Sequence, residues 1–428
     1  MAEKKTISQA ISKRTPGLPG SLDIVTSQDP LWQALLLAVE QYATQYGFTR
    51  VELPIAEDPS LYTTVLGEAH PRVHAIILAA AAGRELALRV GLLPSVLRIL
   101  AQAKMGEPHL TKWQYSGSCL MAGQKELVSD YEFGFEVWGA FNHLTEAQVL
   151  GAAWQLFSAL SLTDVVFEVN TCGSKPSQEA YETALRDYLK GKRYDLCDSC
   201  GDLLSEKPRE VLRCTKLDCQ MVLSEAPTIL DFLDEVSRKQ FTNLLEALEE
   251  LQIPYQLNPL LIGMEGAVGT VVSLKLKIDS VATVVAEAEG HTGFVQRLGG
   301  KNIHAFGLHG SLQLLHRALL DRSTAPATLA RRPAEVYLVP LGELAAKRSL
   351  RLFRDLVEAG VTVFDYFGYA GVKNQLKAAQ EANSPIALIM GQKEAVDEVV
   401  ILRDVKSGMQ EVFSYDKIVD EVKKRLGR

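Results

Sequence analysis

The sequence predicts an α+β protein: an antiparallel sheet core with helices and a helical insertion, followed by a smaller α/β domain. Aromatic-rich strand patterns in the first part support the sheet. Residues 176–251 have an almost entirely helical pattern, and near the C-terminus apolar strands alternate with helical segments. We expect a body at residues 1–322 with the insertion at about 174–250, a linker at 323–333 and a domain at 334–428.

The body is expected to begin with a helix. Residues 29–46 have apolar positions at helical spacing, with Asp29 as N-cap and Pro30 in the first turn. Gly47 ends this helix. A strand that breaks at Pro54 follows, and then ELALRVGLLPSVLRILAQAKM predicts a strand running into a helix.

Two aromatic-rich segments, WQYSGSCLMAG and DYEFGFEVWGAF, predict an antiparallel hairpin with a charged loop. A helix over residues 145–160 and the strand DVVFEVNTCGS follow. The β-rich segments GTVVSLKLKI and SVATVVAEAEG and the helix SLQLLHRALL complete the body. Four apolar strands near the C-terminus alternate with helices, which favours a separate α/β domain. The strands are EVYLVPL, VTVFDYF, PIALIMG and EVVILRDV.

Composition excludes some classes of protein. The apolar run around Ala75–Ala82 is far shorter than the roughly 20 residues of a membrane span. The N-terminal residues lack the apolar stretch of a signal peptide, so we expect a cytoplasmic location and no membrane partner. The net charge of −7 argues only weakly against binding tRNA, because a local basic patch can supply phosphate contacts.

The C-terminal segment from Gly371 to Val412 resembles the anticodon-binding domain of histidyl-tRNA synthetases in the order and spacing of its residues. Upstream, FEVNTCGSKPSQEAYETALRDYL resembles the start of that family's helical insertion. Three further segments resemble the class II motifs. GFTRVELPI resembles motif 1, DYEFGFEVWG resembles the second half of motif 2, and QRLGGKNIHAFGLHGSLQLL resembles the approach to motif 3. The resemblance covers nearly the whole chain. It implies a class II aminoacyl-tRNA synthetase fold, tRNA as a partner and a homodimer formed through the motif 1 region.

The arginines that this resemblance would place on the ATP phosphates are missing. The family's motif 2 arginine clamps the α-phosphate, yet Gly117–Met121 contains no arginine. A second family arginine falls on Ile262 and the motif 3 arginine on Leu314. Removing one preorganised contact to developing charge typically costs about 3–4 kcal/mol, so three losses predict that adenylation is suppressed.

The substrate pocket implied by the resemblance is also altered. The glutamate that faces the substrate amino group falls on Gly91, and a family aspartate falls on Glu265. Glu132 and Glu136 share one face of a strand, so they could bind an amine or imidazolium, or lie on a solvated or ion-paired sheet face. The candidate pocket residues are Arg89, Glu132, Glu136 and Glu265.

Four of the six cysteines have a spacing that resembles a zinc ribbon, a CxxC pair followed by CxxxxC: Cys197, Cys200, Cys214 and Cys219. Zinc is one interpretation. Reduced thiols are the other, since members of the family carry cysteines in this region without a metal in their mechanism. The eight histidines show no ligand spacing and are expected to be structural or exposed.

The candidate tRNA contacts lie in the segment that resembles the anticodon-binding domain: Lys373, Asn374, Lys377 and Arg403. A solvated helix face is the alternative. We therefore expect a catalytically impaired histidyl-tRNA synthetase-like protein with a tRNA-binding or regulatory role and no certain cofactor. One alternative is a divergent but active histidine–tRNA ligase that uses ATP and Mg²⁺. Another is a regulatory subunit of ATP phosphoribosyltransferase, a related family that usually lacks the anticodon-binding domain.

Overall fold

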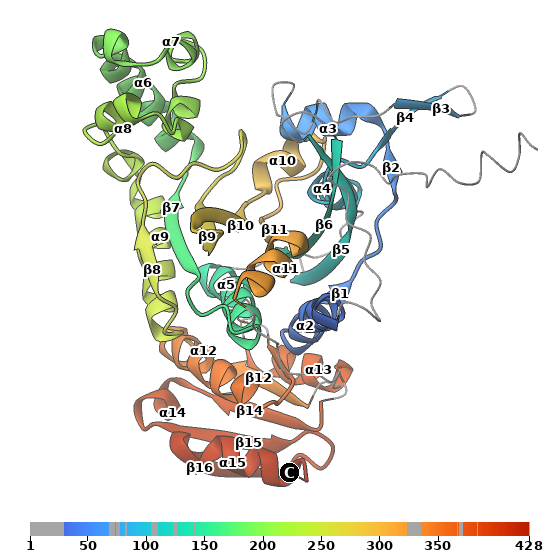
Figure 1. The fold of residues 1–428 in the computed structure, drawn as a ribbon. Helices are drawn as coiled ribbons and strands as arrows, with labels where there is room; N and C mark the ends of the chain where they lie inside the picture. Colours follow the sequence, from blue (N-terminus) through green and yellow to red (C-terminus); the bar gives the residue numbers. More distant parts are fainter. Residues whose placement is uncertain are drawn as a thin grey trace, which may run out of the picture.

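The computed structural model describes residues 30–67, 73, 78–81, 84–103, 110–122, 127–139, 142–322, 335–365, 367, 371–382 and 384–427. The expected linker at 323–333 and the expected N-cap Asp29 lie outside these residues. Figure 1 shows the insertion helices at one end, the sheet of the body in the middle and the C-terminal domain at the other end. Within the described ranges, no helix is long and apolar enough to cross a membrane.

An eight-stranded sheet forms the centre of the body, with the order β1-β5-β6-β11-β10-β9-β7-β8. Neighbouring strands are antiparallel except for the pairs β1–β5 and β7–β8, which are parallel. The strands are β1 (Thr49–Arg50), β5 (Thr111–Ala122), β6 (Leu127–Trp138), β7 (Val166–Thr171), β8 (Tyr255–Leu257), β9 (Thr270–Ile278), β10 (Val281–Gly290) and β11 (Ala305–Ser311). The expected antiparallel core, including the aromatic hairpin β5–β6, is confirmed.

A smaller three-stranded sheet, ordered β2-β4-β3, lies beside the main one. Its strands are β2 (Ala56–Glu57), β3 (Leu78–Ala81) and β4 (Arg84–Leu88). Strand β4 leads into α4 (Leu93–Gln102), which packs against α3 (Pro59–Leu66) and α10 (Thr292–Arg297). These helices form an apolar cluster with Tyr115 and Trp138 of the main sheet.

The opposite face of the main sheet is covered by α2 (Pro30–Gln45), α5 (His143–Ala159) and α11 (Leu312–Asp321). Side chains alternate along β6, so Phe133, Phe135 and Val137 enter this core. Glu132 and Glu136 therefore face the other side of the sheet. The sheet thus separates the large apolar core from the face that carries the acidic residues.

The helical insertion follows β7. It contains α6 (Lys175–Gly191), η2 (Arg193–Asp195), α7 (Asp198–Leu203), η3 (Pro208–Arg213), α8 (Leu217–Leu223), η4 (Ile229–Phe232) and α9 (Glu235–Glu250). The Ser174 hydroxyl accepts a hydrogen bond from the Ser177 amide at 3.3 Å and caps α6. Leu185, Val211 and Leu223 belong to a core of the insertion's own.

The C-terminal domain has a separate five-stranded sheet ordered β13-β12-β14-β15-β16. The strands are β12 (Val336–Pro340), β13 (Val363–Asp365), β14 (Ile386–Met390), β15 (Val399–Asp404) and β16 (Gln410–Ser414). The helices are α12 (Glu343–Glu358), α13 (Val372–Glu381), α14 (Gln392–Val396) and α15 (Tyr415–Arg425). Strands β13, β12 and β14 are parallel, and β15 and β16 are antiparallel, so this is the expected α/β domain.

The body and the C-terminal domain share one apolar core. Helix α12 packs against α5 and α9, and the rings of Tyr46 and Phe353 have centroids 4.6 Å apart. At this junction Lys112 Nζ lies 3.3 Å from Asp365 Oδ2, and the two side chains are 7% and 0% exposed. Lys112 also donates to Gln148 Oε1 at 3.0 Å, and Gln148 Nε2 donates to Asp365 Oδ2 at 2.5 Å.

Lys112→Met should destabilise the chain by about 3–5 kcal/mol, because it leaves the Asp365 carboxylate buried without its cation. The free energy of unfolding from urea titration measures this loss. Lys190→Met is the matched control, since the Lys190–Asp187 pair is 56% and 70% exposed and should contribute less than about 1 kcal/mol. Equal losses in the two variants would contradict the importance of the buried pair.

Candidate functional site

A cleft of about 610 Å³ lies between the acidic face of the main sheet and the helical insertion. Strands β6, β10 and β11 contribute Glu132, Glu289 and His309 to its lining. The segment between β8 and β9 contributes a rim at Ile262–Glu265. The insertion contributes a wall of four side chains, Leu203, Lys207, Glu210 and Arg213.

The charged side chains of the cleft are mainly acidic. Its described lining contains five carboxylates, Glu132, Glu210, Glu265, Glu287 and Glu289. It contains the cations of Lys207 and Arg213, both from the insertion. Among the described lining residues, carboxylates therefore outnumber cations, a balance that suits a positively charged ligand.

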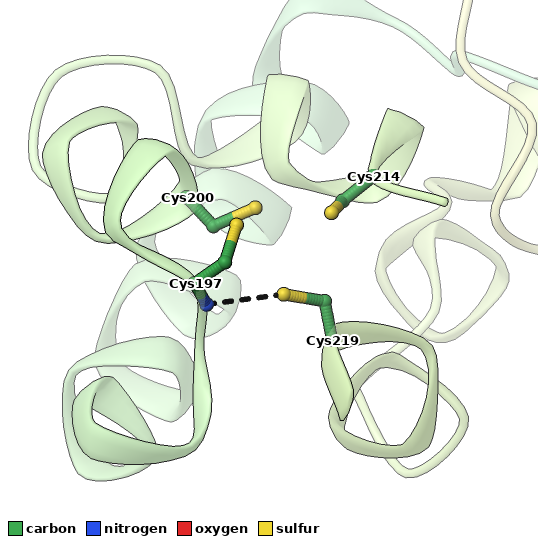
Figure 2. A group of neighbouring side chains, drawn as sticks. All are labelled: Cys197, Cys200, Cys214 and Cys219. Carbon is green, nitrogen blue, oxygen red and sulfur yellow. Dashed lines mark hydrogen bonds between the residues drawn. The ribbon is translucent and has the colours of Figure 1, made fainter. Parts of the chain in front are cut away.

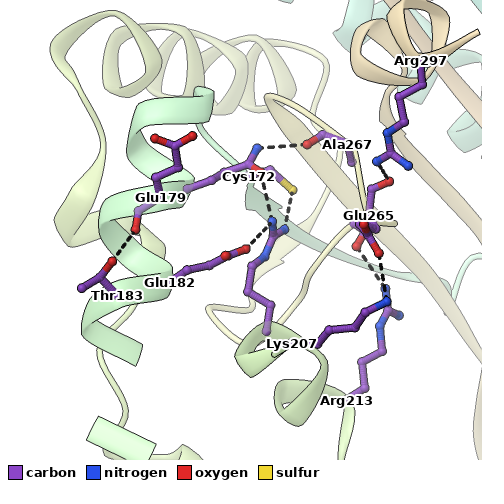
Figure 3. A network of polar contacts seen from close by, with 12 residues as sticks. Cys172, Glu179, Glu182, Thr183, Lys207, Arg213, Glu265, Ala267 and Arg297 are labelled. Atoms are coloured by element: carbon purple, nitrogen blue, oxygen red, sulfur yellow. Dashed lines mark hydrogen bonds and ion pairs between the residues drawn. The ribbon is translucent and has the colours of Figure 1, made fainter. Parts of the chain in front are cut away.

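Both lining cations are held by protein groups. Lys207 Nζ lies 3.2 Å from Glu265 Oε2, while the Glu265 carbonyl accepts a hydrogen bond from Arg297 (Figure 3). Arg213 donates to the Gly263 carbonyl at 3.1 Å and lies 3.2 Å from Glu210 Oε2. These contacts tie the insertion to the rim of the cleft.

A buried ion pair lies beneath the cleft. His291 Nδ1 is 2.8 Å from Glu136 Oε1, and both side chains are fully buried. His291 Nε2 lies 3.9 Å from Glu289 Oε1. Burial alone would lower the pKa of His291, but the carboxylates of Glu136 and Glu289 raise it above its usual value. Gly307 of β11 leaves space for the Glu136 side chain, because a Cβ at position 307 would overlap the Glu136 carboxylate.

Glu289 connects the buried pair to the cleft. Its side chain is 5% exposed, and Oε2 accepts a hydrogen bond from the Met264 amide at 2.8 Å. Oε1 has no hydrogen-bond partner among the described residues. Burial raises the pKa of Glu289 to about 7. Gly263 allows the close approach of the rim, since a Cβ there would lie 2.5 Å from Glu289 Oε2.

The structure brings together part of the predicted pocket. Glu132 and Glu265 line the cleft, and Glu136 lies beneath it. Arg89 is not among the lining residues. Its guanidinium donates to backbone carbonyls of Ser118, Leu53 and Pro54, the last two at 3.2 and 3.3 Å. Arg89 therefore connects β5 with the segment after β1.

Ile262 and Leu314, which stand where the resemblance would place arginines, lie in apolar surroundings. Ile262 is 7% exposed and packs into the core of the insertion at the edge of the cleft. Leu314 packs against the main core on the helical side of the sheet. Neither side chain can neutralise a phosphate.

The acidic residues of β10 and the adjoining histidine were not singled out from the sequence. His291 was expected to be structural or exposed, and it is buried in an ion pair with Glu136. A signal was available, because Glu287 and Glu289 are two residues apart in an otherwise apolar strand and so share a face. The insertion residues Lys207 and Arg213 had no comparable signal.

The four cysteines Cys197, Cys200, Cys214 and Cys219 converge in the insertion (Figure 2). Their Sγ atoms all lie within 4.8 Å of one another. The backbone amide of Cys197 donates to Cys219 Sγ at 3.2 Å. The arrangement has the donor set of a four-cysteine metal centre.

The candidate tRNA contacts lie on one side of the C-terminal sheet. Lys373, Asn374 and Lys377 are exposed on α13. Arg403 lies on β15 and pairs in register with Ala387, which packs in the same cluster as α13. All four residues therefore belong to the side of the sheet that α13 covers.

Family comparisons agree with this architecture. Residues 29–263 match the family model "Histidyl-tRNA synthetase", and residues 335–425 match "Anticodon binding domain". A histidine–tRNA ligase of Dehalococcoides mccartyi is 26% identical over 414 residues, covering 95% of this chain and 99% of the relative. One from Geobacillus sp. is 27% identical over 421 residues, covering 95% and 98%.

Solved structures share the fold. Apo histidyl-tRNA synthetase of S. aureus has a TM-score of 0.59 at 21% identity, covering 96% of this chain and 100% of that one. A protein of Bacillus halodurans, described as an ATP phosphoribosyltransferase regulatory subunit/histidyl-tRNA synthetase, has a TM-score of 0.53 at 15% identity, covering 89% and 99%. With its class II-like sheet, its C-terminal domain and a family model that spans more than half of its length, this chain belongs to the histidyl-tRNA synthetase family.

Proposed function

We propose that this chain is a histidyl-tRNA synthetase-like protein that does not form an aminoacyl adenylate and acts by binding tRNA or by regulation. The observation that supports this most directly is the charge of the described lining of the cleft. Five glutamates, one of which (Glu289) has a pKa raised to about 7, outnumber the cations Lys207 and Arg213 there. Adenylation needs the opposite balance, because negative charge builds on the α-phosphate in the transition state.

The magnitude of the repulsion supports the same conclusion. Two like charges about 4 Å apart repel by about 4 kcal/mol at the effective dielectric constant near a protein surface. A triphosphate in this cleft would lie near several carboxylates, among them Glu132, Glu265 and Glu287. A small cationic ligand, such as an amine or an imidazolium, would gain from the same groups.

The main alternative is an active histidine–tRNA ligase. The curated relatives, named as such ligases and similar over 95% of this chain, support it. In the structure, however, Lys207 and Arg213 already pair with Glu265 and Glu210, so a phosphate would have to compete with these two carboxylates for them. A regulatory subunit of ATP phosphoribosyltransferase is a second alternative, and the C-terminal domain makes us rank it lower. The homodimer, the cytoplasmic location and the domain boundaries remain predictions.

The C-terminal sheet supports tRNA as the partner. Helix α13 packs over β12 and β14, where it meets Tyr337 and Ile389. On the same side, Val412 of β16 is 63% exposed, and its neighbour in register is Ile401 of β15. An uncovered strip of sheet therefore lies beside a helix with exposed lysines. Unstacked bases can pack on such a strip while the cations bind phosphates.

The purified protein should not support histidine-dependent exchange between pyrophosphate and ATP, with or without added Mg²⁺. The physical reason is the acidic cleft and the apolar side chains of Ile262 and Leu314. Isotope exchange above a no-enzyme control, in an assay in which an active histidyl-tRNA synthetase serves as the positive control, would reject the proposal in favour of the ligase.

Glu289→Gln should change how stability depends on pH. Between the ordinary glutamate value of 4.5 and the raised pKa of about 7, the folded chain retains a proton on Glu289 that the unfolded chain releases. The wild-type free energy of unfolding therefore falls through this window as pH rises. The variant should be similar to wild type near pH 5 and more stable at pH 8, by up to roughly 3 kcal/mol.

Denaturant titrations at both pH values measure the Glu289 effect. Glu287→Gln is the control, because it removes an exposed carboxylate from the same strand. It should weaken the pH dependence only slightly, since burial is the largest cause of the raised pKa of Glu289 and the charge of Glu287 a smaller one. A constant difference between wild type and Glu289→Gln from pH 5 to 8 would argue against a raised pKa at Glu289.

tRNA binding should be steeply salt-dependent and should weaken in the triple variant Lys373→Met, Lys377→Met and Arg403→Met. Each lost phosphate contact should reduce the slope of log affinity against log salt by about one. Fluorescence anisotropy with labelled tRNA measures this slope. The control is the triple variant Lys417→Met, Lys423→Met and Lys424→Met on α15. This helix packs on the opposite side of the sheet, and the control variant loses as many positive charges as the test variant. Equal weakening in both variants would indicate non-specific attraction and reject this surface.

A further inference from the structure

We propose that the helical insertion is a zinc-binding module in which Cys197, Cys200, Cys214 and Cys219 hold one structural Zn²⁺. The four residues come from three parts of the insertion. Cys197 precedes α7 and Cys200 lies within it, Cys214 follows η3, and Cys219 lies in α8. Zinc binding is a property of the insertion and does not depend on whether the cleft is catalytic.

The geometry of the sulfur atoms fits tetrahedral coordination. With Zn–S bonds of about 2.3 Å, the sulfurs of a tetrahedral site are about 3.8 Å apart. The four Sγ atoms lie within 4.8 Å of one another, so small side-chain rotations suffice to close the site. Figure 2 shows the side chains pointing toward a common centre. The amide of Cys197 donates to Cys219 Sγ at 3.2 Å, a contact that stabilises a thiolate ligand.

The donor set identifies the class of metal. Four thiolates in a tetrahedral arrangement select Zn²⁺ or an iron centre over hard cations such as Mg²⁺ or Ca²⁺. All four positions are taken by protein ligands, which is typical of a structural site and leaves no position for substrate. The thiols lose their protons when the metal binds.

The local fold explains why this part of the insertion would need a metal. Helices α7 and α8 have six and seven residues, and the connection between them contains the short 3-10 helix η3. Isolated helices shorter than about 12–15 residues are marginal in water. A metal bound to both pairs of cysteines would fix α7, η3 and α8 relative to one another.

The site also lies next to a wall of the cleft. Cys214 directly follows Arg213, which donates to the Gly263 carbonyl at 3.1 Å on the rim. Lys207, just before η3, lies 3.2 Å from Glu265. The metal would therefore hold the segment from which the insertion contacts the cleft. Its removal should loosen residues 197–219 and the contact with Gly263.

The first test is the metal content of the full-length protein purified without a metal-binding tag. Inductively coupled plasma mass spectrometry should find about one zinc per chain, and native mass spectrometry should show the matching mass. Replacement by Co²⁺ should give the visible d–d and thiolate charge-transfer bands of a tetrahedral cobalt–thiolate site. Hydrogen exchange of residues 197–219 should rise when the metal is removed.

Cys214→Ser and Cys219→Ser should each bind less metal than the wild type, whereas Cys119→Ser, a buried cysteine of β5, should retain one zinc per chain. If the variants fail to fold, release of zinc from the wild type by a mercurial, followed with a chromogenic chelator, tests the same sulfurs. Metal-free protein that takes up neither Zn²⁺ nor Co²⁺ would overturn the proposal. So would iron in place of zinc, or a disulfide between any of the four cysteines.

Discussion

Three neighbouring strands place Glu136, Gly307 and Glu289 in one row across the sheet. Two carboxylates in such a row would repel each other, and both are buried. The imidazole of His291 lies against both of them, and the missing side chain of Gly307 leaves the room for this contact. The acidic floor of the cleft therefore depends on a glycine and a histidine that carry none of its negative charge.

This row also explains what the sequence could and could not predict. Alternation along one strand was sufficient to assign Glu132 and Glu136 to a common face, and the spacing of the cysteines was sufficient to suggest a cluster. Glu289 and Glu136 come into the same row only because the strands have the order β6-β11-β10. The spacing of residues along the sequence does not predict this strand order. The same is true of Lys112 and Asp365, which meet across 253 positions of the chain. Arg89 had the charge expected of a pocket residue, but nearby carbonyls bind its guanidinium.

The cleft and the C-terminal sheet differ in their chemistry. Among the described residues that line the cleft, carboxylates outnumber cations, and Lys207 and Arg213 are paired with protein groups. On the side of the C-terminal sheet that α13 covers, lysines are exposed and the strand surface beside them is partly uncovered. The two surfaces share no residues, so a change of charge in one leaves the contacts of the other intact.

The continuous core between body and C-terminal domain limits how the parts of this chain can be recombined. Phe353 and Leu356 of α12 pack in the same cluster as Tyr46, which directly follows α2, Leu150 of α5 and Leu248 of α9. A chimera that took only the C-terminal domain from a relative would place unmatched side chains against these helices, and overpacking or voids would follow. Grafting would succeed only if the facing positions of α2, α5 and α9 were exchanged together with the domain.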